Sequence, residues 1–314
     1  MKRGSVRTLP ALLTVIIAIP ALAACSAQPA DCEFPSGDAS SVVTVEGPLG
    51  TAPSIDMPTP VIAESTEVST VVKGEGKRLS PGQPALVDVS IVNGATGEVL
   101  QDTGYDGGVL LTAASESLPP VTEALECARE GSRLVVVGTA EDTHQGQPIP
   151  QLGVAAEDSL VFVVDVLETF LPKADGTPRA GNNGDPAVVL APNGRPGITV
   201  PNTEAPEEAV ISVLKEGDGP TLEEGDKAVV HYTGVTWADE KVFDSSWEKK
   251  QPAIFELREG ALIEGFLDGL VGQNVGSQVL LVIPPELGYG EQASPSIPAN
   301  STLIFVVDVL GIAE

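Results

Sequence analysis

An internal repeat constrains this chain more than any other feature, because two copies of one sequence unit are expected to take one fold twice. Residues 159–167 read SLVFVVDVL, and residues 302–310 read TLIFVVDVL. Residues 131–137 read GSRLVVV, and residues 276–282 read GSQVLLV, so the two matches are offset by 143 and 145 positions. A length of 314 residues leaves room for two domains of this spacing.

The second copy has the pattern of an antiparallel sheet with one short helix. Apolar or alternating runs of strand length occupy residues 209–215, 227–233, 278–283 and 302–310. Within residues 262–271, apolar side chains recur at helical spacing and form one face. A sheet with one apolar face and a single amphipathic helix must pack against each other. Each copy is therefore predicted to be an α+β unit.

The first residues have the composition of a targeting segment, so they are set aside from the fold. The apolar run from Leu9 to Ala24 is short and is broken by two prolines, which argues against a spanning helix. Residues 22–25, LAAC, resemble the bacterial lipobox; the resemblance implies cleavage before Cys25 and diacylglycerol on its sulfur. Two acyl chains suffice for stable anchoring. We expect a protein outside the cytoplasm, lipid-anchored to a bacterial cell membrane; an ordinary secretory signal is the alternative.

Cysteine use agrees with an oxidising compartment, where disulfides persist. Once Cys25 carries lipid, Cys32 and Cys127 remain, and a single pair has one connectivity. The sequence predicts a Cys32–Cys127 disulfide, which by chain-entropy reasoning is worth about 4–5 kcal/mol. Two free buried thiols are the alternative.

The charge balance excludes one class of partner. Acids outnumber bases 44 to 17, which gives a net charge of −27. Removing the three bases of the signal, Lys2, Arg3 and Arg7, takes this to −30. Such a charge repels phosphate backbones, so no nucleic-acid partner is expected. A solvated outer surface is the simplest explanation, and steering of basic clients is a weaker one.

The second copy also distributes aromatic side chains, two tyrosines and one carboxylate over its strand-like segments. We find no nucleophile elbow and no phosphate loop, and the chain has too few free N and S ligands for zinc. The set describes an apolar pocket with two phenols and one acid, which suits a reaction that breaks no covalent bond. Neither cofactor nor metal is expected. The residues concerned are Tyr232, Phe243, Asp244, Ile263, Phe266, Tyr289 and Phe305.

These motifs, in this order over residues 208–314, resemble the FKBP-type peptidyl-prolyl cis–trans isomerase family. The resemblance implies a half-barrel of strands wrapped around the helix, with the active pocket between helix and sheet. Phe266 stands where the family has tryptophan, and this loss of aromatic area predicts only weak binding of rapamycin-type macrolides. By position, the family's pocket residues correspond to Tyr232, Phe243, Asp244, Leu262, Ile263, Tyr289, Ile297 and Phe305.

The physical reading of the same residues leads to the same chemistry. An X-Pro bond isomerises slowly because amide resonance sets a barrier of about 18–20 kcal/mol. A dry apolar pocket favours the twisted amide over the planar, better-hydrated one. We expect Asp244 to orient polar groups beside Tyr232 without transferring a proton. The Tyr289 hydroxyl and, as the resemblance implies, the Ile263 N–H hold carbonyl groups. Apolar contact with substrate is expected from Phe243, Phe255, Leu262, Phe266, Ile297 and Phe305.

The first copy keeps the frame but not this chemistry. By offset, aliphatic or amide side chains replace the pocket residues, His144 stands in place of Tyr289, and Phe162 alone is retained. The replacements are Val89 for Tyr232, Leu100 for Phe243, Gln101 for Asp244 and Val121 for Phe266. We predict a degenerate copy with little or no activity.

Together these observations predict an α+β protein of two tandem FKBP-like domains. The predicted boundaries are a signal peptide at 1–24, a tether at 25–41, a degenerate domain at 42–170, a linker at 171–186 and an isomerase domain at 187–314. The expected partners are X-Pro segments of exported client proteins, whose folding the enzyme assists. The alternatives are a holdase that binds proline segments without turnover, and a purely structural envelope protein.

Overall fold

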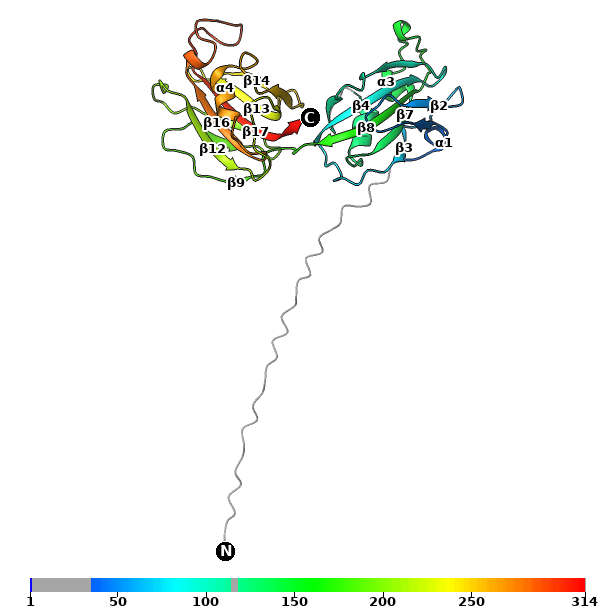
Figure 1. Cartoon of the computed structure of the whole chain (residues 1–314), viewed down its shortest axis with the longest axis horizontal. Coiled ribbons are helices and arrows are strands. Elements are labelled where there is room, and N and C mark those ends of the chain that lie inside the picture. Colours follow the sequence, from blue (N-terminus) through cyan, green and yellow to red (C-terminus); the bar gives the residue numbers. More distant parts are fainter. Residues whose placement is uncertain (2–34, 114–117, 314) are drawn as a thin grey trace. The chain divides into compact units, whose positions relative to one another are not determined.

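The computed structural model describes Met1 and residues 35–113 and 118–313 (Figure 1). Antiparallel strands are the main regular structure of these residues, and the helices are few and short, which confirms the predicted α+β class. The predicted signal peptide, Cys25 and Cys32 lie outside the described residues. Among the described residues, no helix combines the length and apolar character that a membrane span requires.

The C-terminal unit is built on one sheet with the order β14-β13-β17-β16-β12-β9, and β15 also pairs with β13. A single α-helix, α4 (Glu264–Leu270), and the 3₁₀ turn η2 (Pro285–Leu287) connect strands of this described sheet. The strands are β9 (Thr177–Pro178), β12 (Val210–Glu216), β13 (Lys227–Thr236), β14 (Val242–Ser245), β15 (Ala253–Glu256), β16 (Gln278–Ile283) and β17 (Leu303–Ala313).

The N-terminal unit contains a second sheet with the order β3-β7-β8-β4-β5, and β6 also pairs with β4. Its strands are β3 (Glu67–Val72), β4 (Pro84–Asn93), β5 (Val99–Asp102), β6 (Val109–Thr112), β7 (Arg133–Gly138) and β8 (Leu160–Thr169). Its helical segments are α1 (Asp38–Ser41), α2 (Pro119–Leu125), α3 (Ala140–His144) and η1 (Pro150–Leu152).

Apart from β9, which has no counterpart in the N-terminal sheet, the strands of the two sheets correspond in order and in register. Phe162 on β8 faces Ile91 on β4, and Phe305 on β17 faces Gly234 on β13. Because side chains alternate between the faces of a strand, this shared register places equivalent residues on equivalent faces. The internal repeat therefore extends to the pairing of the strands.

One face of the C-terminal sheet packs against α4. Phe266, Leu267 and Leu270 of the helix join alternate residues of β13, β16 and β17 in one buried cluster. Gly265 allows the helix to approach the sheet closely, because a Cβ there would lie 2.6 Å from Cγ2 of Ile283. Helix α2 and its sheet form the corresponding cluster in the N-terminal unit. These clusters lie where the sequence pattern predicts the core.

The opposite face of each sheet is covered by a short hairpin that precedes it in the chain. The first hairpin pairs β1 (Thr44–Glu46) with β2 (Ser54–Asp56), and the second pairs β10 (Ala187–Leu190) with β11 (Pro196–Thr199). Each hairpin contributes apolar side chains to a cluster on the outer face of the sheet that follows it. Both sheets are thus buried on two sides, which explains their nearly unbroken apolar central strands.

Three local features go beyond the sequence prediction. Residues 38–41 of the predicted tether form α1, and residues 177–178 of the predicted linker form β9 at the edge of the C-terminal sheet. The predicted helix at 262–271 is shorter at both ends, because Ile263 is the N-cap and Val271 is extended. Cys127 is disulfide-bonded, and its predicted partner Cys32 falls outside the described residues.

Candidate active site

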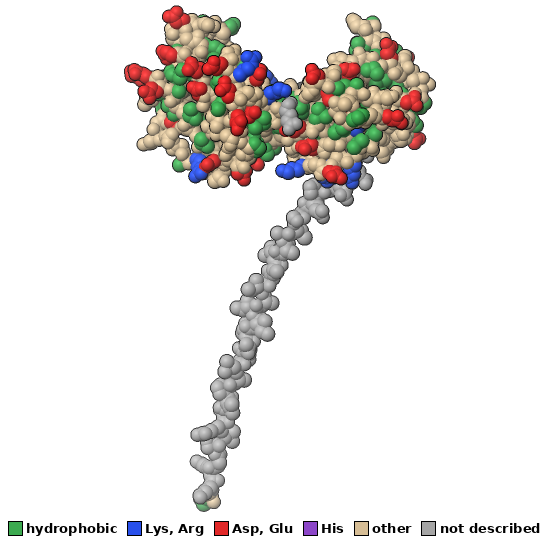
Figure 2. Space-filling view, viewed as in Figure 1, with side chains coloured by type: hydrophobic (Ala, Val, Ile, Leu, Met, Phe, Trp, Pro, Cys, Tyr) green, Lys and Arg blue, Asp and Glu red, His purple; other side chains and the backbone are tan. Residues whose placement is uncertain are grey.

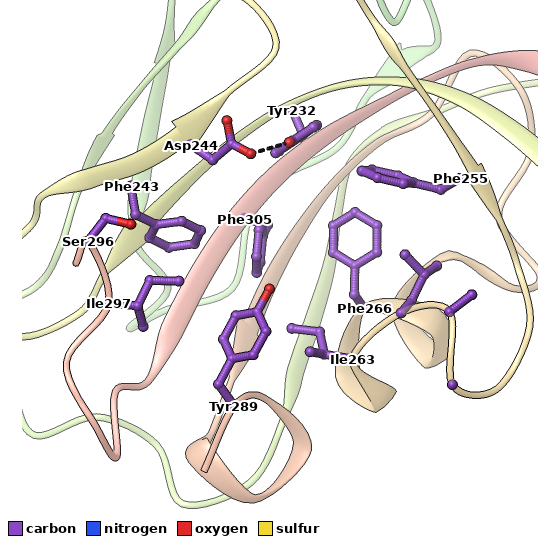
Figure 3. Close-up of a pocket in the computed structure, with 13 residues that line it drawn as sticks. Tyr232, Phe243, Asp244, Phe255, Ile263, Phe266, Tyr289, Ser296, Ile297 and Phe305 are labelled. Carbon is purple, nitrogen blue, oxygen red and sulfur yellow. Dashed lines mark hydrogen bonds between the residues drawn. The ribbon is translucent and has the colours of Figure 1, made fainter. Parts of the chain in front are cut away.

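A cavity of about 560 Å³ opens between α4, the loop after η2 and the strands β13, β14, β15 and β17 (Figure 3). All ten residues that the sequence nominates for catalysis or substrate contact line it. Gly260, Ala261 and Ser296 complete the lining. The predicted site residues therefore share one concavity, although they come from segments spread over more than 70 positions of the chain, from Tyr232 to Phe305.

Aromatic rings form the floor and one wall of the cavity. The ring of Phe305 lies edge-on to Phe243 at 5.4 Å and edge-on to Phe266 at 5.1 Å, measured between centroids. Phe255 meets Phe266 in the same way at 5.5 Å. Edge-to-face pairs at such distances are favourable beyond the area that they bury. The rings therefore support one another, and the cavity keeps its shape without a ligand to hold it open.

Gly234 makes the close approach of two of these rings possible. It lies on β13 opposite Phe305, and a Cβ at this position would lie 2.5 Å from Cζ of Phe243 and 2.9 Å from Cε1 of Phe305. Any larger residue would displace the rings into the cavity. Gly234 was not among the predicted site residues. Its only signal in the sequence is that a glycine follows Tyr232 by two positions near the end of a predicted strand.

The polar corner of the cavity is a short chain of hydrogen bonds. Tyr232 on β13 donates its phenolic hydrogen to Oδ2 of Asp244 on β14 at 2.6 Å. The other carboxylate oxygen, Oδ1, accepts from Nζ of Lys249 at 2.6 Å. Both carboxylate oxygens of Asp244 are thus engaged. Lys249 was not predicted as part of the site, because a contact across a loop leaves no periodic signal in the sequence.

The pKa shifts in this corner argue against proton transfer. Burial and the neighbouring carboxylate of Asp244 both raise the pKa of the Tyr232 hydroxyl above its usual value. Burial alone would raise the pKa of Asp244, but hydrogen bonds from Lys249 and Tyr232 outweigh it and lower that pKa. At neutral pH the phenol is protonated and the carboxylate is ionised. Neither group is poised near pH 7, where a general acid or base works best.

The remaining polar groups of the cavity come from its entrance. Tyr289 follows η2, is 44% exposed, and extends its ring towards the cavity in Figure 3. Ser296 and Ile297 sit in a turn closed by the Ser294 N–H bond to the Ile297 carbonyl. Ile263 is the N-cap residue of α4, so its backbone lies at the helix start. In the described part of the chain, no group of three His, Cys, Asp or Glu side chains could hold a metal ion.

The N-terminal unit has a cavity of about 170 Å³ in the corresponding place. Phe162 lines it in the position of Phe305, and Leu100 and Gln101 stand in the register positions of Phe243 and Asp244. Ile91 occupies the position of Gly234, so an aliphatic side chain stands where the glycine makes room for the rings of Phe243 and Phe305. His144 does not line this cavity; its two ring nitrogens lie within hydrogen-bond distance of the carbonyls of Gln147 and Asp158.

The fold and the cavity define a class of protein: an α+β domain with a preformed apolar pocket that has one polar corner. Comparison with known proteins identifies the family. The sequence model of the FKBP-type peptidyl-prolyl cis-trans isomerases matches residues 219–310. The FK506-binding protein of Streptomyces anulatus is 36% identical over 120 residues, which are 38% of this chain and 97% of that protein.

Two further comparisons lead to FkpA of Escherichia coli, a bacterial protein with the same family description. FkpA of Escherichia coli K12 is 41% identical over 103 residues, 33% of this chain and 37% of FkpA. The crystal structure of FkpA from Escherichia coli aligns at 34% identity over 42% of this chain and 53% of that chain, with a TM-score of 0.32. This chain belongs to the FKBP-type peptidyl-prolyl cis–trans isomerase family, and it is an enzyme of that rotamase class.

Proposed function

We propose that the C-terminal pocket catalyses rotation about X-Pro bonds by binding the twisted amide more tightly than either planar isomer. The observation that carries this proposal is that one cavity walled by aromatic rings holds all ten nominated residues, with the Tyr232–Asp244 hydrogen bond at one corner. A twisted amide loses resonance and carbonyl polarity, so an apolar surrounding favours it over the planar form. Lowering the barrier by about 4–8 kcal/mol corresponds to about 10³–10⁶ in rate.

Each side chain has a role in this proposal. The three rings of Phe243, Phe266 and Phe305, with Ile297, surround the prolyl ring. The hydroxyl of Tyr289 and, following the family resemblance, the backbone N–H of Ile263 hold the carbonyl groups on either side of the bond. Asp244 is fixed by Tyr232 and Lys249, so it supplies an oriented negative charge and not a mobile proton.

The N-terminal unit, in this proposal, is a second FKBP-like domain without appreciable isomerase activity. The shared strand order and register support its relationship to the C-terminal unit. The smaller cavity, the replacement of Asp244 by Gln101, and Ile91 in the place of Gly234 support the loss of activity. This unit then acts as a spacer, a stabiliser or a surface for clients.

The proposed location is the outer side of a bacterial cell membrane, with Cys25 as the lipid-carrying residue. The lipobox-like residues 22–25 support this, and Cys127 in a disulfide agrees with an oxidising compartment. The clients would then be exported proteins with slow prolyl bonds. A Cys25→Ala variant expressed in a bacterial host should lose incorporation of labelled fatty acid and leave the membrane fraction. Unchanged labelling would contradict the anchor.

A proline-limited refolding assay with the full-length protein tests the pocket. The variant Asp244→Ala plus Tyr289→Phe should lose most of the acceleration. The matched variant Gln101→Ala plus His144→Phe alters the corresponding positions of the N-terminal unit and should retain it. Equal acceleration by both variants would contradict the assignment. Slower aggregation of the client without faster refolding would identify a holdase instead.

A further inference from the structure

The N-terminal unit keeps an open cavity, although the polar groups of the active site are replaced there. This cavity measures about 170 Å³. It reaches the surface, because Gln101, Pro119 and Leu152 line it and are exposed, Leu152 by 39%. Sites for whole small molecules measure about 300–1,000 Å³, whereas an apolar cavity of about 150 Å³ holds a group as large as benzene. The space therefore suits a single side chain.

The lining of this cavity is apolar and uncharged. Acidic side chains are scattered over both units in Figure 2, yet none of the described residues that line the cavity carries a charge. Gln101 and Thr143 contribute the polar side chains of this lining, and the Thr143 hydroxyl donates to the carbonyl of Thr139 at 2.7 Å. Water in such a cavity finds few partners, so an apolar group displaces it favourably.

The frame of the cavity is the frame of the active site. Leu100, Gln101 and Phe162 stand at the register positions of three active-site residues. Leu118, the N-cap residue of α2, lines this cavity as Ile263, the N-cap residue of α4, lines the active site. An extended polypeptide segment would thus meet the same strands and the same helix start in either unit. The walls differ, because Phe162 is the single aromatic residue among the described lining residues.

The amide of Gln101 suits the backbone of such a segment. It offers a donor and an acceptor, which are the two groups that a peptide unit pairs with. Asp244 at the equivalent position only accepts, and its two oxygens are engaged by Tyr232 and Lys249. Because Gln101 is exposed at the cavity, a segment whose side chain enters the cavity can reach this amide.

We propose that this cavity is a second binding site, which takes one leucine, isoleucine or valine side chain from an extended segment of an unfolded protein. Its aliphatic walls fit a branched aliphatic side chain, and the replacement of aromatic rings removes the selection for proline. The inference goes beyond the proposed isomerase activity, and its test does not require that activity. One chain would then hold apolar segments in one unit and rotate prolyl bonds in the other.

Methyl NMR of the full-length protein distinguishes this cavity from the active site, because isoleucines line both. Ile91 and Ile149 report on the N-terminal cavity, and Ile263 and Ile297 report on the active site. The probes are two capped pentapeptides without proline, which have leucine or alanine at the centre and alanine elsewhere. The leucine peptide should shift the signals of Ile91 and Ile149 saturably. It should bind about tenfold more tightly than the alanine peptide, because it buries a larger apolar side chain.

A pair of variants tests the position of the site. Leu152→Asp places a carboxylate at the cavity and should weaken binding of the leucine peptide about tenfold or more, because an apolar group no longer covers the bound side chain. Val71→Asp adds the same charge to β3, at a residue that is 40% exposed and does not line the cavity. This matched variant should bind like the wild type. Both positions are exposed, so both variants should fold, and the two peptides provide a test that needs no variant.

Every outcome supports or overturns the proposal. Signals of Ile91 and Ile149 that do not shift up to about 10 mM leucine peptide would overturn it. Shifts confined to Ile263 and Ile297 would assign the peptide to the active site and overturn it as well. Equal affinities of the two peptides would exclude a side-chain pocket, and an equal loss in both variants would assign the effect to charge. None of these measurements involves prolyl isomerisation, so the inference and the proposed function can fail separately.

Discussion

Apart from the edge strand β9, the two units of this chain have the same strand order and the same register, yet their cavities measure about 560 and 170 Å³. Position by position, the sheets keep their buried Phe162 and Phe305, whereas Gly234 in one unit corresponds to Ile91 in the other. The same scaffold thus accommodates a large cavity in one unit and a small one in the other. Because the core lies on the same face as the cavity, aliphatic side chains can convert pocket into core while the sheet keeps its pairing.

The outer faces of the two sheets differ as well. In the N-terminal unit, buried Arg133 binds Asp165 at 2.6 Å and also donates to the carbonyls of Gly47 and Pro48. In the C-terminal unit, Gln278 donates to Asp308 at 2.7 Å. A charged pair and an amide–acid pair therefore occupy one register position. The comparison suggests four experiments, which follow from the largest expected effect to the smallest.

Removing the charge of Arg133 should have the largest effect. Arg133→Leu leaves Asp165 buried without its cation, which is expected to destabilise the N-terminal unit by about 3–5 kcal/mol. Hydrogen exchange of the β7 and β8 amides measures this change. Arg133→Gln should cost less, because the amide can imitate Gln278. Equal stability of the Leu variant and the wild type would show that the pair contributes little.

Acid should weaken the C-terminal unit through His231. This side chain stacks on Trp247 at 4.0 Å, and burial lowers its pKa from 6.5 to about 4. The unfolded chain takes up the proton first, so this stability is present above pH 6.5 and is lost as pH falls through 4. The loss should reach about 3 kcal/mol. Urea unfolding followed by tryptophan emission at pH 7.5 and 4 measures it.

A variant without the imidazole isolates the contribution of that single group. Asp88 holds the register position of His231 in the N-terminal unit, so no histidine titrates there. His231→Gln should show a pH dependence that is weaker by the same amount. The contributions of the carboxylates are shared by both proteins and cancel in the comparison. An identical pH dependence of the variant and the wild type would exclude His231 as the source.

The third-largest effect is expected from exchanging Gly234 and Ile91, the equivalent residues that distinguish the two cavities. In Gly234→Ile, the new side chain meets Phe243 and Phe305, so the rings must move into the cavity. We expect kcat/KM to fall about 100-fold, or about 2.7 kcal/mol. Peptide exchange by NMR measures it. Ile91→Gly, the reverse change, should leave isomerase activity intact, and a comparable loss there would point to coupling between the units.

Removing one hydrogen bond from the polar corner should have the smallest effect. Tyr232→Phe deletes the donor to Oδ2 of Asp244, while Lys249 still holds Oδ1. The expected loss is about 1 kcal/mol, seen as a fall of about fivefold in kcat/KM. Lys249→Gln should cost less still, because its ion pair is exposed. A loss above 100-fold in Tyr232→Phe would mean that the hydroxyl takes part in the reaction itself.

The sequence predicted the core and the pocket where periodicity or family resemblance could be read. Alternation along β13 and β17 placed Tyr232 and Phe305 on one face, and helical spacing placed Ile263 and Phe266 together. Tyr289 and Ile297 lie in loops without periodicity; Tyr289 was nominated as one of two phenols, and only the resemblance indicated Ile297. The structure brings these residues into one cavity, and their catalytic roles remain predictions.

Other features could not be foreseen because they depend on contacts distant in the sequence. The ion pair of Lys249 with Asp244 forms across a loop. The strand β9 is two residues long and becomes a strand only by pairing with β12. The hairpins at residues 44–56 and 187–199 have strands of three or four residues, too short to show a clear period. Their apolar side chains can be recognised as core residues only when the sheets that they cover are known.

The second hairpin determines how short a soluble fragment of the C-terminal unit can be. The family match begins at residue 219, but Leu280, Val282, Ile304 and Val306 turn their side chains towards the hairpin at 187–199 and are at most 1% exposed. A fragment trimmed to the family match would expose these four side chains to solvent as one apolar patch that favours aggregation. Crystallographers and engineers who want a soluble catalytic core should therefore start it before Ala187.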